Sequence, residues 1–496
     1  GVIHFRTRDP ELLSQKEEGL SYLFQNRIMS RFSSANQERT LHWDMNYGTE
    51  KWGLFTSLSF SDFGHLRAGA DFPDEYPDLG KRSCYQIRRN GTDQLVPNDD
   101  PELQVGTAYS QVDFLQKVRF RPDDFNDLLL NVQYSTSSDI PRYDNLAEPA
   151  RDNPDGLRFA EWYYGPQKRF LSSLKWRSLK KNKYYDKATF IAAYQRINED
   201  RLDRRFGNPL RSFNLEAVDV WSLTGDFDLR LAGGGEEEPK HLLAYGVELN
   251  HNRVNSEAGN LNIETGEYLY GMEPTRYPSG SSSMSTGGVY ANYNYRSVDE
   301  RLSANAGIRF SFARLSAQFS EEDPIQWPAE YTGGVTNNNG ALTWGLGAQY
   351  RLPGKWEFRA LASSAFRAPN IDDFGKVRPR GDNILVPNIN LTPENAINGE
   401  LSISKTWSSE DRKRGRGRRS RSKQNYSLTT SVTGFYTYLT DAIVRADAEP
   451  FGDTILFFDG EPYRIQTNIN ANEAYVMGLS GNILLKVGEH WQWRAG

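Results

Sequence analysis

Residues 301–312 read RLSANAGIRFSF: every even-numbered position is apolar, and the odd-numbered positions carry small, polar or charged residues. Successive side chains of a β-strand point to opposite faces, so this stretch predicts a strand with one apolar and one polar face. Residues 341–352, ALTWGLGAQYRL, repeat the pattern, as do Leu41/Trp43/Met45/Tyr47, Leu128/Leu130/Val132/Tyr134, Trp221/Leu223/Phe227/Leu229/Leu231 and Leu243/Tyr245/Val247/Leu249. Runs of about ten such residues are typical of membrane-crossing barrel strands, whereas soluble sandwiches usually have strands of about five or six.

The connections between the predicted strands differ in length according to their position in the series. The pattern gives about seventeen strands, near residues 20–31, 38–48, 53–63, 110–120, 127–136, 167–176, 186–196, 217–231, 241–252, 288–296, 301–313, 341–352, 356–366, 398–407, 425–438, 472–486 and from Trp491 onward. One alternate set of connections is mostly short: 48–52, 121–126, 232–240, 296–300, 353–355 and 487–490. The other set is generally long: 64–109, 137–166, 197–216, 253–287, 314–340, 367–397 and 439–471. Outer-membrane barrels have short periplasmic turns and longer extracellular loops, so we expect an all-β, transmembrane antiparallel β-barrel.

The composition excludes several other classes of protein. The chain has 496 residues, of which 38% are hydrophobic and 13% aromatic, and its mean hydropathy is −0.69. It contains no run of about 18 apolar residues, which excludes an inner-membrane helical protein. Cys84 is the only cysteine, so neither an internal disulfide nor a thiolate metal cluster can form. A net charge of −5 gives no nucleic-acid signature, and we expect no nucleic-acid partner.

Three short motifs resemble one family of proteins. Residues 1–7, GVIHFRT, are similar to the segment that closes the plug domain of TonB-dependent receptors. Phe366, Arg367, Ala368 and Pro369 match the F-R-A-P box of that family. Residues 388–394, NINLTPE, resemble its N-P-N-L-x-P-E box through Asn388, Leu391, Pro393 and Glu394, with Ile389 in place of the proline. The two boxes flank the connection between the thirteenth and fourteenth predicted strands, where the family has its seventh extracellular loop.

Further stretches resemble the haem- and haemoglobin-receptor-like branch of this family. They are residues 61–69 (SDFGHLRAG), 109–117 (YSQVDFLQK), 161–169 (EWYYGPQKR), 436–444 (YTYLTDAIV) and 474–479 (AYVMGL). The resemblance implies that residues 1–10 are the last strand of a plug domain and that residues 11–496 are about the first seventeen strands of the barrel. Family barrels have about 22 strands, so this barrel is expected to be incomplete at the C-terminus, with most of the plug missing.

The resemblance also implies a function. The receptor would transport a scarce nutrient (haem, an iron chelate or a cobamide) actively through a plugged barrel in the Gram-negative outer membrane. Its partners would be outer-membrane lipid, the TonB energy-transducing complex acting through the missing plug, and a small-molecule or haem-protein ligand. The alternative is a receptor-like barrel that serves as a structural or partner-binding subunit of an envelope complex. A passive porin and an oligosaccharide or peptide importer are further, less favoured alternatives.

The segment between the two boxes supplies the candidate ligand residues Arg378, Arg380, Asp382 and Asn383. The two arginines could form charge-assisted hydrogen bonds with a carboxylate-bearing ligand. The alternative is that they form ion pairs with Asp372, Asp373 and Asp382.

In haem receptors of the family a histidine between the boxes ligates haem, but residues 370–387 contain none. His65 is the substitute candidate, and the alternative for it is an ordinary loop histidine.

Other chemistry has little support in the sequence. No pair among the six histidines has metal-ligand spacing, so we expect no metal site. No nucleophile–base set or catalytic carboxylate pair stands out; we therefore expect no enzyme activity and name no cofactor. Residues 412–423 hold a dense run of Lys and Arg on a predicted periplasmic turn. Such a run is usually a solvated loop, and contact with an anionic partner is the alternative.

Overall fold

The computed structural model describes residues 6–13, 21–69, 74–150, 156–232, 239–271, 273–408, 426–449, 452–458 and 461–496. Within these residues, seventeen strands pair with their neighbours in sequence order to form one continuous wall. They are β1 (Leu23–Ser33), β2 (Glu38–Gly48), β3 (Trp52–Phe63), β8 (Tyr109–Phe120), β9 (Asn126–Ser137), β12 (Lys168–Ser178), β13 (Lys187–Arg205), β14 (Leu210–Ala232), β15 (Lys240–Asn262), β17 (Ser282–Arg296), β18 (Leu302–Ala317), β19 (Val335–Leu352), β20 (Trp356–Arg367), β23 (Glu394–Ser408), β24 (Tyr426–Asp447), β26 (Glu461–Val487) and β27 (Trp491–Ala495).

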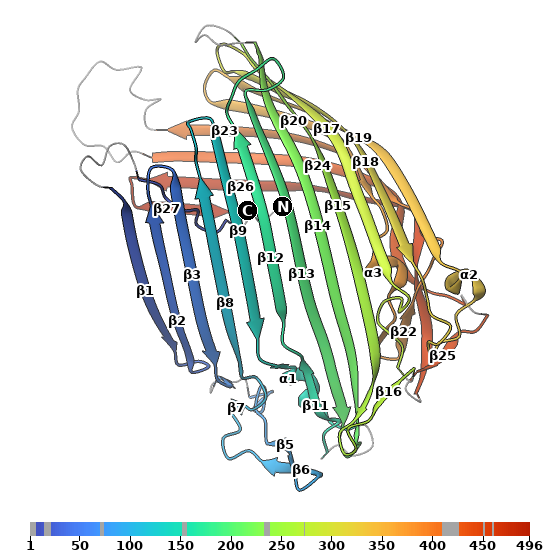
Figure 1. Cartoon of the computed structure of the whole chain (residues 1–496). Helices are drawn as coiled ribbons and strands as arrows, with labels where there is room; N and C mark the ends of the chain where they lie inside the picture. Colours follow the sequence, from blue (N-terminus) through green and yellow to red (C-terminus); the bar gives the residue numbers. More distant parts are fainter. Residues whose placement is uncertain are drawn as a thin grey trace.

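Each pair of neighbouring wall strands is antiparallel. In Figure 1 the sheet curves from β1, in blue, through β14 and β15, in green, to β24 and β26 on the far side. The predicted all-β barrel wall is therefore confirmed, and it stays open in the described residues because β1 and β27 each pair on one side only.

The two faces of the wall differ as the period-two pattern predicts. Ile308, Phe310 and Leu346 are each about half exposed in the isolated chain, although they are large and apolar. Their lateral neighbours in the register are apolar as well, because Ile308 lies opposite Trp344 and Phe310 lies opposite Leu342. Such a continuous apolar surface fits contact with lipid, and the alternate side chains face the lumen.

Several wall strands are much longer than the sequence predicts. Strands β13, β14, β15, β24 and β26 have 19, 23, 23, 22 and 27 residues, whereas a bilayer crossing needs about 9–11. The predicted loop 197–216 is wrong for this reason: β13 and β14 continue to a turn at 206–209. Beyond the lipid both faces are polar, so period-two hydrophobicity no longer marks the strand.

The connections still sort by side, although strand extension shortens several of them. We call one rim the long-loop side; it carries 64–108, 138–167, 263–281, 318–334, 368–393 and 448–460, with short turns at 34–37 and 206–209. The opposite rim, the short-turn side, carries 49–51, 121–125, 179–186, 297–301, 353–355 and 488–490. The basic run 412–423 lies outside the described residues.

The long loops contain small elements that the sequence did not predict. The additional strands are β4 (Leu66–Arg67), β5 (Cys84–Arg89), β6 (Thr92–Pro97), β7 (Leu103–Gln104), β10 (Ile140–Pro141), β11 (Phe159–Tyr164), β16 (Tyr268–Tyr270), β21 (Arg378–Arg380), β22 (Asn383–Val386) and β25 (Ile455–Phe458). The helices, which we did not expect, are α1 (Tyr143–Leu146), α2 (Ala329–Thr332) and α3 (Ile371–Gly375). No described helix is long and apolar enough to cross a membrane.

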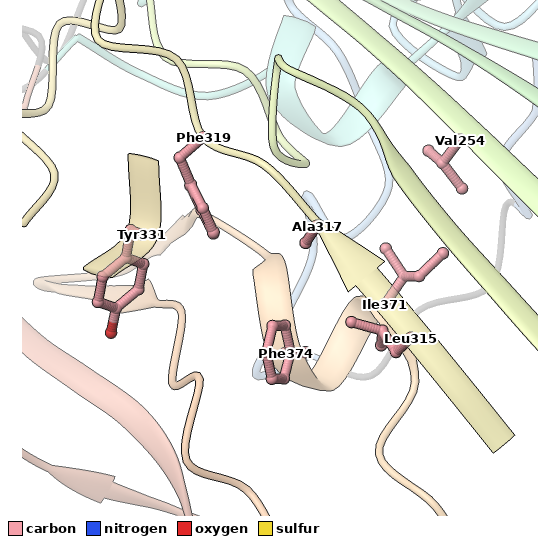
Figure 2. Packing of buried hydrophobic residues seen from close by; sticks show 7 residues of the cluster. All are labelled: Val254, Leu315, Ala317, Phe319, Tyr331, Ile371 and Phe374. Atoms are coloured by element: carbon pink, nitrogen blue, oxygen red, sulfur yellow. The ribbon is translucent and has the colours of Figure 1, made fainter. Parts of the chain in front are cut away.

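The hydrophobic core of the protein lies at the long-loop side. Figure 2 shows Ile371 and Phe374 of α3 beside Leu315 near the end of β18. Phe319 and Tyr331 complete the cluster from the connection between β18 and β19. Phe374 is fully buried, so the cluster holds the loop that carries the two sequence boxes.

The lipid-facing assignment predicts different effects for one substitution on the two faces. Val289 lies near the middle of the apolar face, and Asn292 on the same strand faces the lumen. We expect V289R to destabilise the folded barrel in lipid vesicles by about 2–4 kcal/mol, because the guanidinium would face hydrocarbon. The matched variant N292R should fold almost like wild type. Folding yield is measured by the heat-dependent gel shift of barrels; equal losses for both variants would contradict the assignment.

Candidate functional site

The loop between β20 and β23 is built onto the wall at several points. Helix α3 begins with a capping box, in which the Asn370 side chain accepts from the backbone of Asp373 at 2.8 Å. Strand β22 then pairs in parallel with residues 464–467 of β26. Ile384 and Val386 of β22 are buried with Ile465 in a second apolar cluster. The loop therefore has a fixed path, although it has little regular structure.

Arg367 of the first box forms ion pairs with Asp373 and Glu394, and we call these three residues the clamp. Arg367 donates to Glu394 at 2.9 Å and to Asp373 at 2.6 Å. Glu394 also accepts from the backbone N–H of Ile443 at 2.6 Å. Arg367 and Glu394 are register partners on β20 and β23. The clamp thus joins the two ends of the loop to each other and to the start of α3.

The second box is hydrogen-bonded to the wall through its amides. Asn388 donates to the carbonyl of Asn468 at 2.8 Å, and the backbone N–H of Thr392 donates to Asn470 at 2.9 Å. Leu391 is almost fully buried. Pro369 of the first box is also buried, whereas Phe366, Ala368 and Pro393 are partly exposed. The box residues therefore shape the loop, and the ligand surface has to come from elsewhere.

A buried ion-pair network fixes the loops on the opposite part of the rim. Arg204 donates to both carboxylate oxygens of Asp93 at 2.7 and 2.8 Å, and Arg204 and Asp93 are each 1% exposed at the side chain. Glu161 accepts from Arg204 at 2.9 Å and from Arg211 at 2.6 Å. Burial raises the pKa of Asp93, but hydrogen bonds from Arg204 and the Gly207 backbone outweigh it and hold this pKa at about 2. The β5–β6 hairpin is thereby attached to β11, β13 and β14.

Between these two anchored regions lies a cavity of about 840 Å³, which we call the chamber. Arginines outnumber carboxylates in its lining, six to four, and several aromatic rings complete it. The arginines are Arg142, Arg158, Arg201, Arg205, Arg276 and Arg378; the carboxylates are Glu148, Glu199, Asp203 and Glu273; the rings are Phe159, Trp162, Tyr164 and Tyr463. A cavity with excess cationic groups and aromatic walls suits a planar or anionic ligand.

Two of the chamber arginines keep unused hydrogen-bonding capacity. The Nε atom of Arg276 is buried and has no hydrogen-bond partner among the described residues. Arg378 is exposed and forms no ion pair within the described part of the chain. The backbone N–H of Val377 donates to the carbonyl of Arg276 at 3.0 Å, which brings the two arginine-bearing segments together. Arg276 is not predicted from the sequence, because it lies about a hundred positions before Arg378 in the chain.

Asp372 and Asp373, two expected partners of the loop arginines, form ion pairs with other residues. Asp372 is paired with Lys376 and accepts from Tyr277 at 2.9 Å, and Asp373 is paired with Arg367. Within the described residues Arg378 therefore forms an ion pair with neither Asp372 nor Asp373, in contrast to the alternative from the sequence. Asp382 contributes its carbonyl to the backbone of Arg464 at 2.9 Å. The backbone of Asn383 lies in β22, and the side chain of Arg380 lies outside the described part.

Below the chamber, Glu216 is buried against Arg201, which donates to it at 2.8 Å. Burial raises the pKa of Glu216 to about 7, although Arg201 and Arg276 act in the opposite direction. The Oε1 atom has no hydrogen-bond partner among the described residues. When Glu216 is protonated, Arg201 of the chamber lining loses a negatively charged partner.

The structure places His65 in a different setting from these arginines. Its Nδ1 atom accepts from the backbone N–H groups of Gly106 and Thr107 at 3.2 and 3.3 Å. Burial, with a smaller effect of Arg82, lowers the pKa of His65. His65 is not among the residues that line the chamber. Its contacts fit a loop histidine that organises the 64–108 connection.

The N-terminal segment 6–13 crosses the lumenal face of β2, β3 and β8 near the short-turn side. Glu11 and the fully buried Asn46 exchange two hydrogen bonds, at 2.8 and 3.2 Å. Lys117, also buried, donates to Asp9 at 2.6 Å. A Cβ on Gly48 would lie 2.2 Å from the carbonyl oxygen of Glu11, so the close approach requires glycine there.

The Arg367 clamp predicts that one substitution loosens the loop without harming the wall. In R367A the carboxylates of Asp373 and Glu394 lose their cation; because Arg367 is partly exposed to solvent, we expect a cost of about 1–3 kcal/mol to the closed loop. We expect faster proteolytic cleavage within 368–393, with an unchanged heat-dependent gel shift. The control is R359A, which removes a solvent-exposed arginine paired with Glu357 on the same strand. If both variants resist protease equally, the clamp does not hold the loop.

The sequence profile of the family described as TonB dependent receptor-like, beta-barrel, matches residues 89–496. No curated protein sequence matches the chain. A double mutant of the hemophore receptor HasR of Serratia marcescens, in complex with its hemophore HasA and heme, has a TM-score of 0.59 at 13% identity, covering 94% of this chain and 61% of that one. The copper transporter OprC has a TM-score of 0.64 at 12% identity, covering 98% and 63%.

The siderophore receptor PirA from Pseudomonas aeruginosa has a TM-score of 0.54 at 15% identity, covering 95% of this chain and 64% of that one. At these identities the likeness shows the fold alone, and the chain spans less than two thirds of the length of each of these proteins. The match of the family profile extends over much more than half of the chain, on a wall whose geometry agrees with it. The chain therefore belongs to the TonB-dependent receptor family and carries its β-barrel.

Proposed function

We propose that this chain forms the wall and the ligand-binding loops of an outer-membrane receptor that imports a scarce nutrient by energised transport. TonB-dependent receptors are transporters and not enzymes, and they lie in the outer membrane of Gram-negative bacteria. In this proposal the long-loop side faces the outside of the cell and the short-turn side faces the periplasm. The observation that carries it is the arginine-rich chamber, which lies among the long loops.

The lumen of so large a barrel needs a plug, because an open lumen of this width would leak solutes. We propose that residues 1–10 are the end of such a plug and residues 11–496 the barrel. The docking of segment 6–13 on Asn46 and Lys117 supports this, because a preceding plug would then be attached to the wall at its periplasmic end. Force from the TonB complex on that plug would open the path through the lumen.

The chamber favours an anionic ligand. Arg276 and Arg378 keep donor capacity that a carboxylate or another anionic group could use. Haem, an iron chelate and a cobamide are the nutrients we propose, and a haem-protein is a further candidate partner. The compared structures include a hemophore receptor, a copper transporter and a siderophore receptor. These comparisons do not identify one ligand, and we propose that the side chains of the chamber determine which ligand binds.

Growth of a knockout strain on single iron sources tests the nutrient. The strain carries the full-length gene, either wild type or R276A/R378A, with haem or a ferric chelate as the only iron. We expect wild type to restore growth on one of these iron sources. The double variant should need a concentration of that source at least roughly tenfold higher, since each lost charged hydrogen bond weakens binding. The control is R89A, an exposed arginine on the β5–β6 hairpin.

Passive flux distinguishes gated import from a porin. The full-length receptor in liposomes should give negligible swelling with small sugars, whereas free diffusion would contradict the gated mechanism. If the knockout grows normally on haem and on ferric chelates, iron uptake is wrong. The alternative, a structural or partner-binding subunit of an envelope complex, would then be favoured. The buried Arg204–Asp93 network supports this alternative, because it gives the loops a rigid surface that a partner could bind.

A further inference from the structure

The lipid-facing surface of β12 to β18 is layered along the strands. One lateral row, joined by the strand register, is apolar: Leu130, Leu174, Ala192, Leu223, Leu249, Gly287 and Phe312. The next row toward the long-loop side is amphipathic: Ser172, Tyr194, Trp221, His251, Ser285 and Arg314. The row beyond it consists of Phe170, Arg196, Asp219, Arg253 and Ser283, and all of these except Phe170 are charged or polar. Polarity thus rises stepwise, as it does from acyl chains to headgroups.

A groove of about 590 Å³ is hollowed into this surface. It exists because small residues, including Ala192 and Ser285, stand between large ones on the outward face. Its walls are apolar and are provided by Leu130, Leu174, Leu223, Leu249, Trp221 and Phe312. The volume lies in the range of ordinary ligand sites, and the groove opens on the face that the alternation assigns to lipid.

The polar groups at the upper end of the groove are partly engaged with one another. Tyr194 donates to Asp219 at 2.6 Å, and Arg196 lies 3.5 Å from the same carboxylate. His251 is hydrogen-bonded to Ser285 at 2.9 Å. The one carboxylate of the layer therefore already has two partners.

Arg253 and Arg314 differ from these residues. They lie directly above His251 and Phe312, two positions further along β15 and β18. Both side chains are exposed on the outer face, and neither forms an ion pair within the described residues. They stand two strands and two residue positions apart, which places their Cα atoms about 12 Å from each other. Two free guanidinium groups therefore overhang the polar end of an apolar groove.

We propose that this surface is a binding site for a phosphorylated, acylated lipid of the outer leaflet. The proposal depends on the orientation in the proposed function and not on the transported nutrient. Arg253 and Arg314 would bind the phosphate, and the groove would take an acyl chain. Arginine on a lipid-facing surface at headgroup level attracts anionic lipid, and Tyr194 and Trp221 are the residue types that anchor at this interface. A free phosphate would use the arginines but leave the groove empty.

Native mass spectrometry of the full-length receptor in detergent tests the site, with lipid A as the phosphorylated probe and phosphatidylcholine as the zwitterionic one. We expect a lipid A adduct on wild type that phosphatidylcholine and excess inorganic phosphate do not displace. In R253A/R314A lipid A should bind about an order of magnitude more weakly. In A192F, which fills the groove and keeps every charge, binding should also fall.

The matched control is R39A, which removes an arginine that is exposed on the outer face of β2, at the same rim but away from the groove. It should bind lipid A like wild type. All variants are first checked for the heat-dependent gel shift of a folded barrel. Equal lipid A binding by R253A/R314A and wild type would overturn the proposal. An equal loss in R39A, displacement by inorganic phosphate, or a dimer of the chain in place of the lipid adduct would also overturn it.

Discussion

The structure depends on one constraint: inside a bilayer, every backbone N–H and C=O must find its partner within the protein. Lateral antiparallel pairing of long strands satisfies this constraint. Side chains along each strand then face lipid and the lumen alternately. The alternation of Ile308 and Phe310 with polar neighbours is the direct consequence. A transmembrane helix also satisfies its own backbone, but it needs about 20 consecutive apolar residues, whereas apolar residues in these segments recur at every second position.

At the long-loop side the strands of the same wall extend beyond the lipid. There the strands continue without an apolar outer face, and the lumen is filled from within by loops. Apolar clusters around Phe374 and Ile384 hold the loop between β20 and β23, and the Arg204–Asp93 pair holds the loops opposite it. The chamber is the space that remains between two fixed groups of loops. Its charge reflects arginines that have fewer carboxylate partners than they could bind.

The sequence predicts the part of the fold that lipid imposes. Residues 301–312 and 341–352 are correctly predicted as strands, and the order of short and long connections follows from them. Strand ends are not predicted where both faces meet water, as in 197–216. The candidate site is predicted only in part: Arg378 is a candidate from its loop, whereas Arg276 and the buried Glu216 come from another connection and from β14. Their proximity depends on tertiary packing and has no local signal.

Site-directed spin labelling across residues 302–312 tests the central claim most directly. Cys84 is the only cysteine, so a C84S background allows one cysteine to be placed at each position of the full-length receptor in liposomes. The account predicts that even-numbered positions are relaxed mainly by oxygen, which concentrates in lipid, and odd-numbered positions mainly by a water-soluble nickel chelate. A uniform profile, or a period near 3.6, would contradict a wall whose side chains face lipid and lumen in turn.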